Sequence, residues 1–229
     1  MLQKNKKKIT ILGLGIFFFV GVAFFAWNRG VTQFFFQSDK AEKQFITTYS
    51  AHKDFATIYP LITEAREIVQ KNPRHDGAYQ SLAQSYFTIG AFDRARDALL
   101  KAVEIVPDND AYWSFLGRTY QRLKAYPDAA AAYAHALELD RSRVEYYTQL
   151  AWLYYFRFEG DDMLKSYDIL KQGLERFPDD KDLLFDITRY YLYENKMEEF
   201  AYYAPRYLVV DPTDQGGFKK ELEKYKKSK

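Results

Sequence analysis

Apolar side chains recur three and four residues apart through most of the chain, which is the spacing of one face of an α-helix. Residues 79–86 and 95–102 both show this spacing. Gly90 lies between the two stretches, where it favours a break, and Pro107 follows the second, where its missing N–H ends a helix. The apolar positions are Tyr79, Leu82, Ala83 and Tyr86 in the first stretch and Ala95, Leu99 and Ala102 in the second. Residues 76–109 are therefore predicted to form a hairpin of two helices.

The same pattern repeats along the chain with a period of about 34 residues. Residues 110–143 keep it except for the final proline, and residues 144–180 keep it with three extra residues around 158–162. Residues 181–214 carry a weaker version and residues 42–75 a degenerate one. One hairpin cannot bury its own apolar face, so neighbouring units must stack. The predicted fold class is all-α, a solenoid of five helical hairpins over residues 42–214.

The repeated positions resemble the tetratricopeptide repeat. In that family an aromatic residue, Leu, a small residue and Tyr on the first helix precede Ala, a large apolar residue, Ala and Pro on the second. The positions given above for residues 76–109 match this pattern throughout. The next unit has Trp113, Leu116, Gly117, Tyr120, Ala129, Tyr133 and Ala136 in the corresponding places. The resemblance implies a superhelix whose first helices line a concave groove that takes peptides or segments of partner proteins.

The resemblance also assigns the groove-facing positions of the first helices. They are Gln80, Gln84, Phe87, Ser114, Arg118, Arg122, Thr148, Trp152, Tyr155, Arg189 and Tyr193. This set combines stackable rings with amide and guanidinium donors, which suits an extended peptide of some acidic character. The family's chaperone-tail binders carry Lys and Asn at two of these places, where this chain has Gln80 and Gln84.

Trp152 has two interpretations. As a groove residue it is larger than packing requires, which favours a contact with a partner. Alternatively, it packs beneath the long turn at residues 158–162.

The N-terminal region is predicted to anchor the chain in a membrane. Lysines at positions 4, 6, 7 and 8 precede the apolar run Ile9–Trp27, which spans roughly 28 Å as a helix. Because these lysines outnumber the single Arg29 after the run, residues 1–8 are expected in the cytoplasm and the repeats in the periplasm or outside the cell. The alternative is a cleaved secretory signal, with Gly21 and Ala23 as a small-residue cleavage site.

Two further segments flank the repeats. Residues 28–41 are expected to be a short connector. Residues 215–229 carry Phe218, Leu222 and Tyr225 as one apolar stripe on a charged helix, which is typical of a solenoid cap. The lysines of this helix are interpreted as a solvated face, so no nucleic-acid partner is expected.

The chemistry of the sequence points away from catalysis. There is no cysteine, and the three histidines, His52, His75 and His135, lack metal-ligand spacing. HExxH, P-loop, GxSxG and Rossmann motifs are absent from the sequence, so we expect no enzyme activity, cofactor or metal. The expected function is a membrane-anchored adaptor, similar to bacterial anchored repeat proteins, which binds a protein or peptide during assembly, secretion or envelope biogenesis. The alternative is a homo-oligomeric membrane scaffold formed by repeat stacking.

Overall fold

The structure is a computed structural model that describes residues 39–229, and the predicted anchor at residues 9–27 lies outside them. The described residues form eleven α-helices. Their bounds are α2 Asp39–Tyr49, α3 Phe55–Lys71, α4 Asp76–Thr88, α5 Phe92–Ile105, α6 Asp110–Arg122, α7 Tyr126–Leu139, α8 Val144–Arg157, α9 Asp161–Arg176, α10 Lys181–Tyr193, α11 Met197–Val210 and α12 Phe218–Ser228. Between residues 39 and 229 no helix has the length and apolar character needed to cross a membrane.

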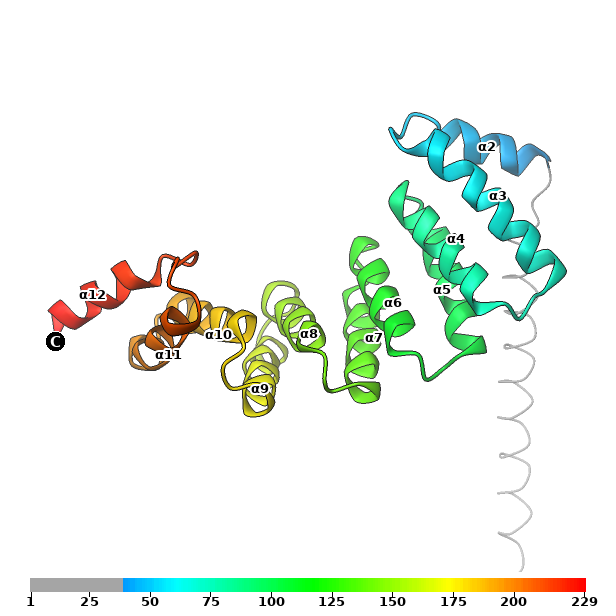
Figure 1. Ribbon diagram of the computed structural model, residues 1–229. Coiled ribbons are helices and arrows are strands. Elements are labelled where there is room, and N and C mark those ends of the chain that lie inside the picture. Colours follow the sequence, from blue (N-terminus) through cyan, green and yellow to red (C-terminus); the bar gives the residue numbers. More distant parts are fainter. Residues whose placement is uncertain (1–38) are drawn as a thin grey trace, which may run out of the picture.

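The helices form a row of antiparallel pairs (Figure 1). The row begins with α2 and α3 and continues through α4–α5, α6–α7, α8–α9 and α10–α11 to α12 at the far end. In this view α8 lies above α9. The expected all-α solenoid of helical hairpins is confirmed.

Helix starts are fixed by side chains in the short connections between pairs. Asn109 accepts a hydrogen bond from the Tyr112 amide (3.2 Å) at the start of α6, and Asp180 accepts from the Leu183 amide (3.0 Å) at the start of α10. These bonds satisfy amide groups that the helix itself leaves without partners. His75 also accepts a hydrogen bond from the Ala78 amide (3.1 Å) before α4. The junctions before α4, α6 and α10 are therefore capping sites, whereas Arg143 before α8 makes no such bond.

In three of the pairs, the repeat has a small residue on the first helix and a large residue on the second. Gly117 and Tyr133 form this pair in α6–α7; the positions one repeat earlier are Ala83 and Leu99, and those one repeat later are Ala151 and Leu170. A Cβ atom at Gly117 would lie only 2.8 Å from Cδ1 of Tyr133, closer than nonbonded carbons approach. The larger ring at position 133 is thus accommodated by the smaller residue at position 117.

The C-terminal helix covers the end of the apolar core. Phe218 and Leu222 of α12 are buried, and the Phe218 ring lies 5.3 Å from that of Tyr207 and 5.5 Å from that of Phe185. The lysines of α12 are exposed. This arrangement has the form of the capping helix that the apolar stripe predicts.

Candidate partner-binding face

The first helices of successive repeats are joined by partly buried hydrogen bonds. Tyr112 Oη donates to Asp76 Oδ2 (2.7 Å), and Tyr146 Oη donates to Asp110 Oδ2 (2.5 Å) one repeat later. Burial and the neighbouring Asp76 carboxylate raise the pKa of Tyr112 to about 12. Both hydroxyls therefore stay protonated and keep donating at neutral pH, which holds α4, α6 and α8 in register.

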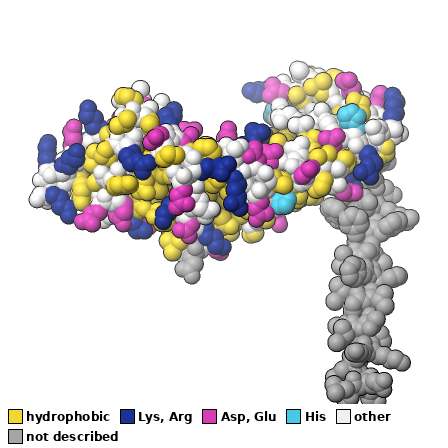
Figure 2. All heavy atoms as spheres, turned by 60° about the horizontal axis from the view of Figure 1, so that its bottom comes forward, with side chains coloured by type: hydrophobic (Ala, Val, Ile, Leu, Met, Phe, Trp, Pro, Cys, Tyr) yellow, Lys and Arg dark blue, Asp and Glu magenta, His cyan; other side chains and the backbone are white. Residues whose placement is uncertain are grey.

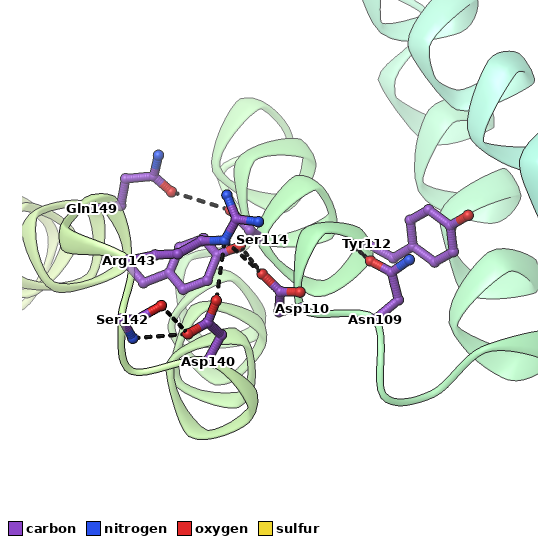
Figure 3. A network of polar contacts seen from close by, with 9 residues as sticks. Asn109, Asp110, Tyr112, Ser114, Asp140, Ser142, Arg143 and Gln149 are labelled. Atoms are coloured by element: carbon purple, nitrogen blue, oxygen red, sulfur yellow. Dashed lines mark hydrogen bonds and ion pairs between the residues drawn. The ribbon is translucent and has the colours of Figure 1, made fainter.

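A polar network extends the second of these links (Figure 3). Arg143 Nε lies 3.0 Å from Asp110 Oδ2 and 3.3 Å from Asp140 Oδ2. Ser142 donates to Asp140 through both its amide (2.8 Å) and its hydroxyl (2.6 Å). The connection between α7 and α8 is thereby tied to the start of α6, so the spacing of α6 and α8 is fixed from one end.

The opposite faces of these first helices border a groove. A space of about 320 Å³ is bounded by α6, α8 and α10. Its lining residues are Gln121, Thr148, Gln149, Trp152, Asp182, Phe185 and Asp186. A second space of about 470 Å³ lies between α3 and α4 and includes Gln80 and Gln84. Figure 2 shows the outline of the molecule dipping between its two ends. We call the α4, α6, α8 and α10 surface that carries these residues the inner face.

Arginines and phenylalanines form the first cluster on the inner face. The guanidinium carbon of Arg118 lies 4.7 Å from the ring centre of Phe115 and 5.0 Å from that of Phe87. The guanidinium carbon of Arg122 lies 4.7 Å from the ring centre of Phe92. Both arginines are exposed, and between residues 39 and 229 neither forms an ion pair. The cluster is therefore a positively charged, ring-supported surface.

A buried carboxylate organises the second cluster. Asp186 Oδ2 accepts from Trp152 Nε1 (2.7 Å), and Asp186 Oδ1 accepts from Arg189 Nη2 (2.8 Å). The Arg189 guanidinium carbon also lies 3.4 Å from the Trp152 ring centre. Burial raises the pKa of Asp186 to about 6, although Arg189 and Trp152 both stabilise its charged form.

This geometry decides how Trp152 packs. Phe158, in the long turn, contacts Tyr154 (5.0 Å between ring centres), whereas Trp152 stacks on Phe156 (4.5 Å) and bonds to α10. Packing beneath the turn is therefore the wrong interpretation. Trp152 joins two repeats, and Arg189, predicted to be a donor to a partner, already has an internal carboxylate.

The remaining predicted groove residues lie at three separate places on the inner face. Tyr155 Oη donates to Glu194 Oε1 (3.2 Å), and the Tyr193 ring stacks on Tyr155 at 6.5 Å while staying 59% exposed. Ser114 Oγ donates to Gln149 Oε1 at a long 3.5 Å, between α6 and α8. Thr148 lines the groove itself. The structure thus groups the predicted residues into an α4–α6 set and an α8–α10 set.

Sequence reasoning missed several residues of this face. Phe92 and Phe115 support the arginines, and Asp186 holds Trp152 and Arg189. Phe156, 47% exposed beside Trp152, was also missed. A search for apolar side chains next to groove positions would have found Phe115 and Phe156. The bond of Asp186 to Trp152 spans 34 positions, which no local pattern shows, whereas its pairing with Arg189 follows an i,i+3 helical spacing that could have been found.

The arrangement offers binding groups and few reactive ones. Within residues 39–229 no group of three His, Asp or Glu side chains could hold a metal ion. A small pocket beside Trp152 measures about 20 Å³, which is room for about one water molecule. The exposed rings, amides and guanidinium groups of the inner face are instead suited to contacts with another chain.

Comparisons with known proteins agree with this description. Two tetratricopeptide repeat family models match this chain, one over residues 51–119 and the other over residues 111–143. Over 78 residues, 34% of this chain, the sequence is 33% identical to anaphase-promoting complex subunit 3 of Schizosaccharomyces pombe. The match spans only 12% of that protein.

Two solved structures of MamA show a similar fold, each with a TM-score of 0.58. They are 17% and 16% identical to this chain and cover 65% and 74% of it, and the match covers 85% and 91% of the MamA chains. At this identity the likeness shows the fold alone. Residues 51–119 and 111–143 therefore carry tetratricopeptide repeats.

Proposed function

We propose that the chain is a membrane-anchored adaptor whose inner face holds an extended segment of a partner protein. The observation that carries this proposal is the row of rings and polar donors on α4, α6, α8 and α10, which borders the groove and remains partly or fully exposed. Such side chains dominate the binding energy of protein interfaces. The adaptor would act during assembly, secretion or envelope biogenesis.

A direct test places a photo-crosslinking residue in the groove of the full-length chain in its native cells. Thr148 is the best position, because it lines the groove and its replacement leaves the hydrogen bond between Trp152 and Asp186 intact. We expect irradiation to give one heterologous adduct, identified by mass spectrometry. Lys171, exposed on the second helix α9, is the matched control and should not give this adduct. Equal labelling from both positions, or none from Thr148, would contradict a partner on the inner face.

A homo-oligomeric scaffold is the second candidate, and one observation favours it. Tyr202 and Val209 of α11 are 63% and 79% exposed, which offers an apolar surface away from the inner face. In Figure 2 hydrophobic side chains gather over the C-terminal half of the row. Photo-adducts from Thr148 to a second copy of this chain alone would support the scaffold.

Membrane attachment through residues 9–27 is part of the proposal. The basic residues before this run favour a cytoplasmic N-terminus and an exported repeat region. Because the sequence has no cysteine, single introduced cysteines report topology without background. In intact cells a maleimide that does not cross the inner membrane should label Lys171→Cys, whereas Asn5→Cys should react only after lysis. The reverse pattern would overturn the proposed orientation.

A further inference from the structure

We infer that Arg118 and Arg122 form a two-point receptor for carboxylates, which binds a partner segment carrying acidic residues at alternate positions. The inference rests on the proposed function, because it specifies which chemistry the inner face recognises. It concerns the α4–α6 set of residues, away from the Trp152–Asp186–Arg189 cluster.

The rings beneath these arginines hold each guanidinium in one place. Arg118 lies over Phe115 and Phe87, and Arg122 lies over Phe92, with guanidinium carbons 4.7–5.0 Å from these ring centres. The rings themselves are packed together, with Phe87 5.2 Å from Phe92 and 5.4 Å from Phe115. An arginine supported in this way loses less freedom when it binds, and its N–H groups match the two oxygens of a carboxylate.

Three other arginines with ring contacts already have a carboxylate partner in the described part of the chain. Arg66 pairs with Glu42 (2.8 Å), Arg143 with Asp110 (3.0 Å) and Arg189 with Asp186 (2.8 Å). Arg118 and Arg122 have no such pair in the part of the chain that the structure describes. The predicted groove positions beside them, Gln80, Gln84 and Ser114, are uncharged. Two adjacent positive charges thus remain available to an external anion.

The spacing of the two arginines selects the form of the partner. They are four residues apart on α6, which separates them by about 6 Å along the helix. In an extended strand, side chains two residues apart point the same way and are separated by about 6.6 Å. Acidic residues at positions i and i+2 of an extended segment therefore match Arg118 and Arg122, one carboxylate to each.

The test measures binding of fluorescent ten-residue peptides to the purified full-length chain by anisotropy. The probe carries two Glu residues at i and i+2 among Ser, Thr and Val, and comparison peptides carry the two Glu residues at i and i+5, two Lys residues, or two phosphoserines. We expect the i and i+2 Glu peptide to bind most tightly. The affinity should fall about 10-fold in Arg118→Gln and in Arg122→Gln, and about 100-fold in the double variant.

Arg157→Gln is the matched control. Arg157 is exposed, and its guanidinium carbon lies 5.2 Å from the ring centre of Tyr126. It is five residues after Trp152, which turns it about 140° around α8 and away from the inner face. The same loss of charge and ring contact there should leave peptide affinity unchanged. Equal effects of Arg157→Gln and the double variant, or tight binding of the phosphoserine peptide alone, would overturn the carboxylate assignment.

Crosslinking from Thr148 separates this inference from the proposed function. If the wild-type chain gives a heterologous adduct that persists at full yield in the Arg118→Gln/Arg122→Gln chain, the groove binds a partner but the arginine receptor is wrong. If the wild-type chain gives no adduct while the peptide affinities follow the prediction, the receptor stands and the adaptor role fails.

Discussion

Replacing Gly117 with alanine is expected to lower the free energy of unfolding by about 2–3 kcal/mol, although both neighbouring repeats carry alanine at this position. The added methyl group would meet the ring atoms of Tyr133 at 2.8–2.9 Å. That ring is fully buried, so it can move away only by displacing other core side chains. Urea denaturation followed by circular dichroism measures the change.

A second substitution should rescue the first. Tyr133→Leu removes the clash and recreates the Ala–Leu pair found at Ala83 and Leu99. Tyr133→Leu alone should cost about 2 kcal/mol because it leaves a cavity, whereas the Gly117→Ala/Tyr133→Leu chain should lie within about 1 kcal/mol of wild type. Additive losses in the double variant would show that the two positions are not coupled, and would contradict the packing described.

Replacing Arg189 with glutamine is expected to lower the free energy of unfolding by about 2–3 kcal/mol at pH 7.5, because it leaves the buried Asp186 carboxylate without its guanidinium. The cost should be much smaller at pH 5. Arg157→Gln, which removes an exposed arginine without an ion pair in the described chain, should change the free energy of unfolding by less than about 0.5 kcal/mol at both pH values.

The sign of this pH dependence follows from Asp186. Its pKa is about 6 in the folded chain against an ordinary value of 3.8, and its charged neighbours are Arg189 and Asp182. Between pH 4 and 6 the folded chain holds a proton that the unfolded chain has released, so Asp186 lowers stability as the pH rises. Without Arg189 the pKa of folded Asp186 rises further, and the loss of stability continues above pH 6. Equal costs of Arg189→Gln at pH 5 and pH 7.5 would contradict this account.

The solenoid could be predicted from the sequence because each repeat is a local pattern. Apolar spacing, Gly90 and Pro107 all act within one hairpin, and the period then requires stacking. The pairing of Gly117 with Tyr133 was harder to predict, because a small residue on one helix makes room for a large residue on the other. The neighbouring repeats have alanine at this position, so Gly117 alone does not reveal that the Tyr133 ring requires a glycine there.

The site could be predicted only as a set of positions. Repeat geometry assigns residues such as Arg118, Trp152 and Arg189 to the first helices, but not the partners that each finds inside the chain. Arg189 and Arg118 look equivalent in sequence, yet Asp186 engages one and nothing in the described chain pairs with the other. That difference comes from one carboxylate in the same helix: Asp186 lies three residues before Arg189 and pairs with it, whereas Phe115 occupies that place before Arg118.

The central claim is that the inner face of the repeats holds a partner segment. Hydroxyl-radical footprinting of the full-length chain, alone and bound to the partner captured at Thr148, tests it most directly. The account predicts protection of Phe87, Phe115 and Tyr193 on the first helices, with unchanged oxidation of Leu164 and Tyr202 on the second helices α9 and α11. Protection of Leu164 and Tyr202, with the inner-face rings oxidised as in the free chain, would contradict it.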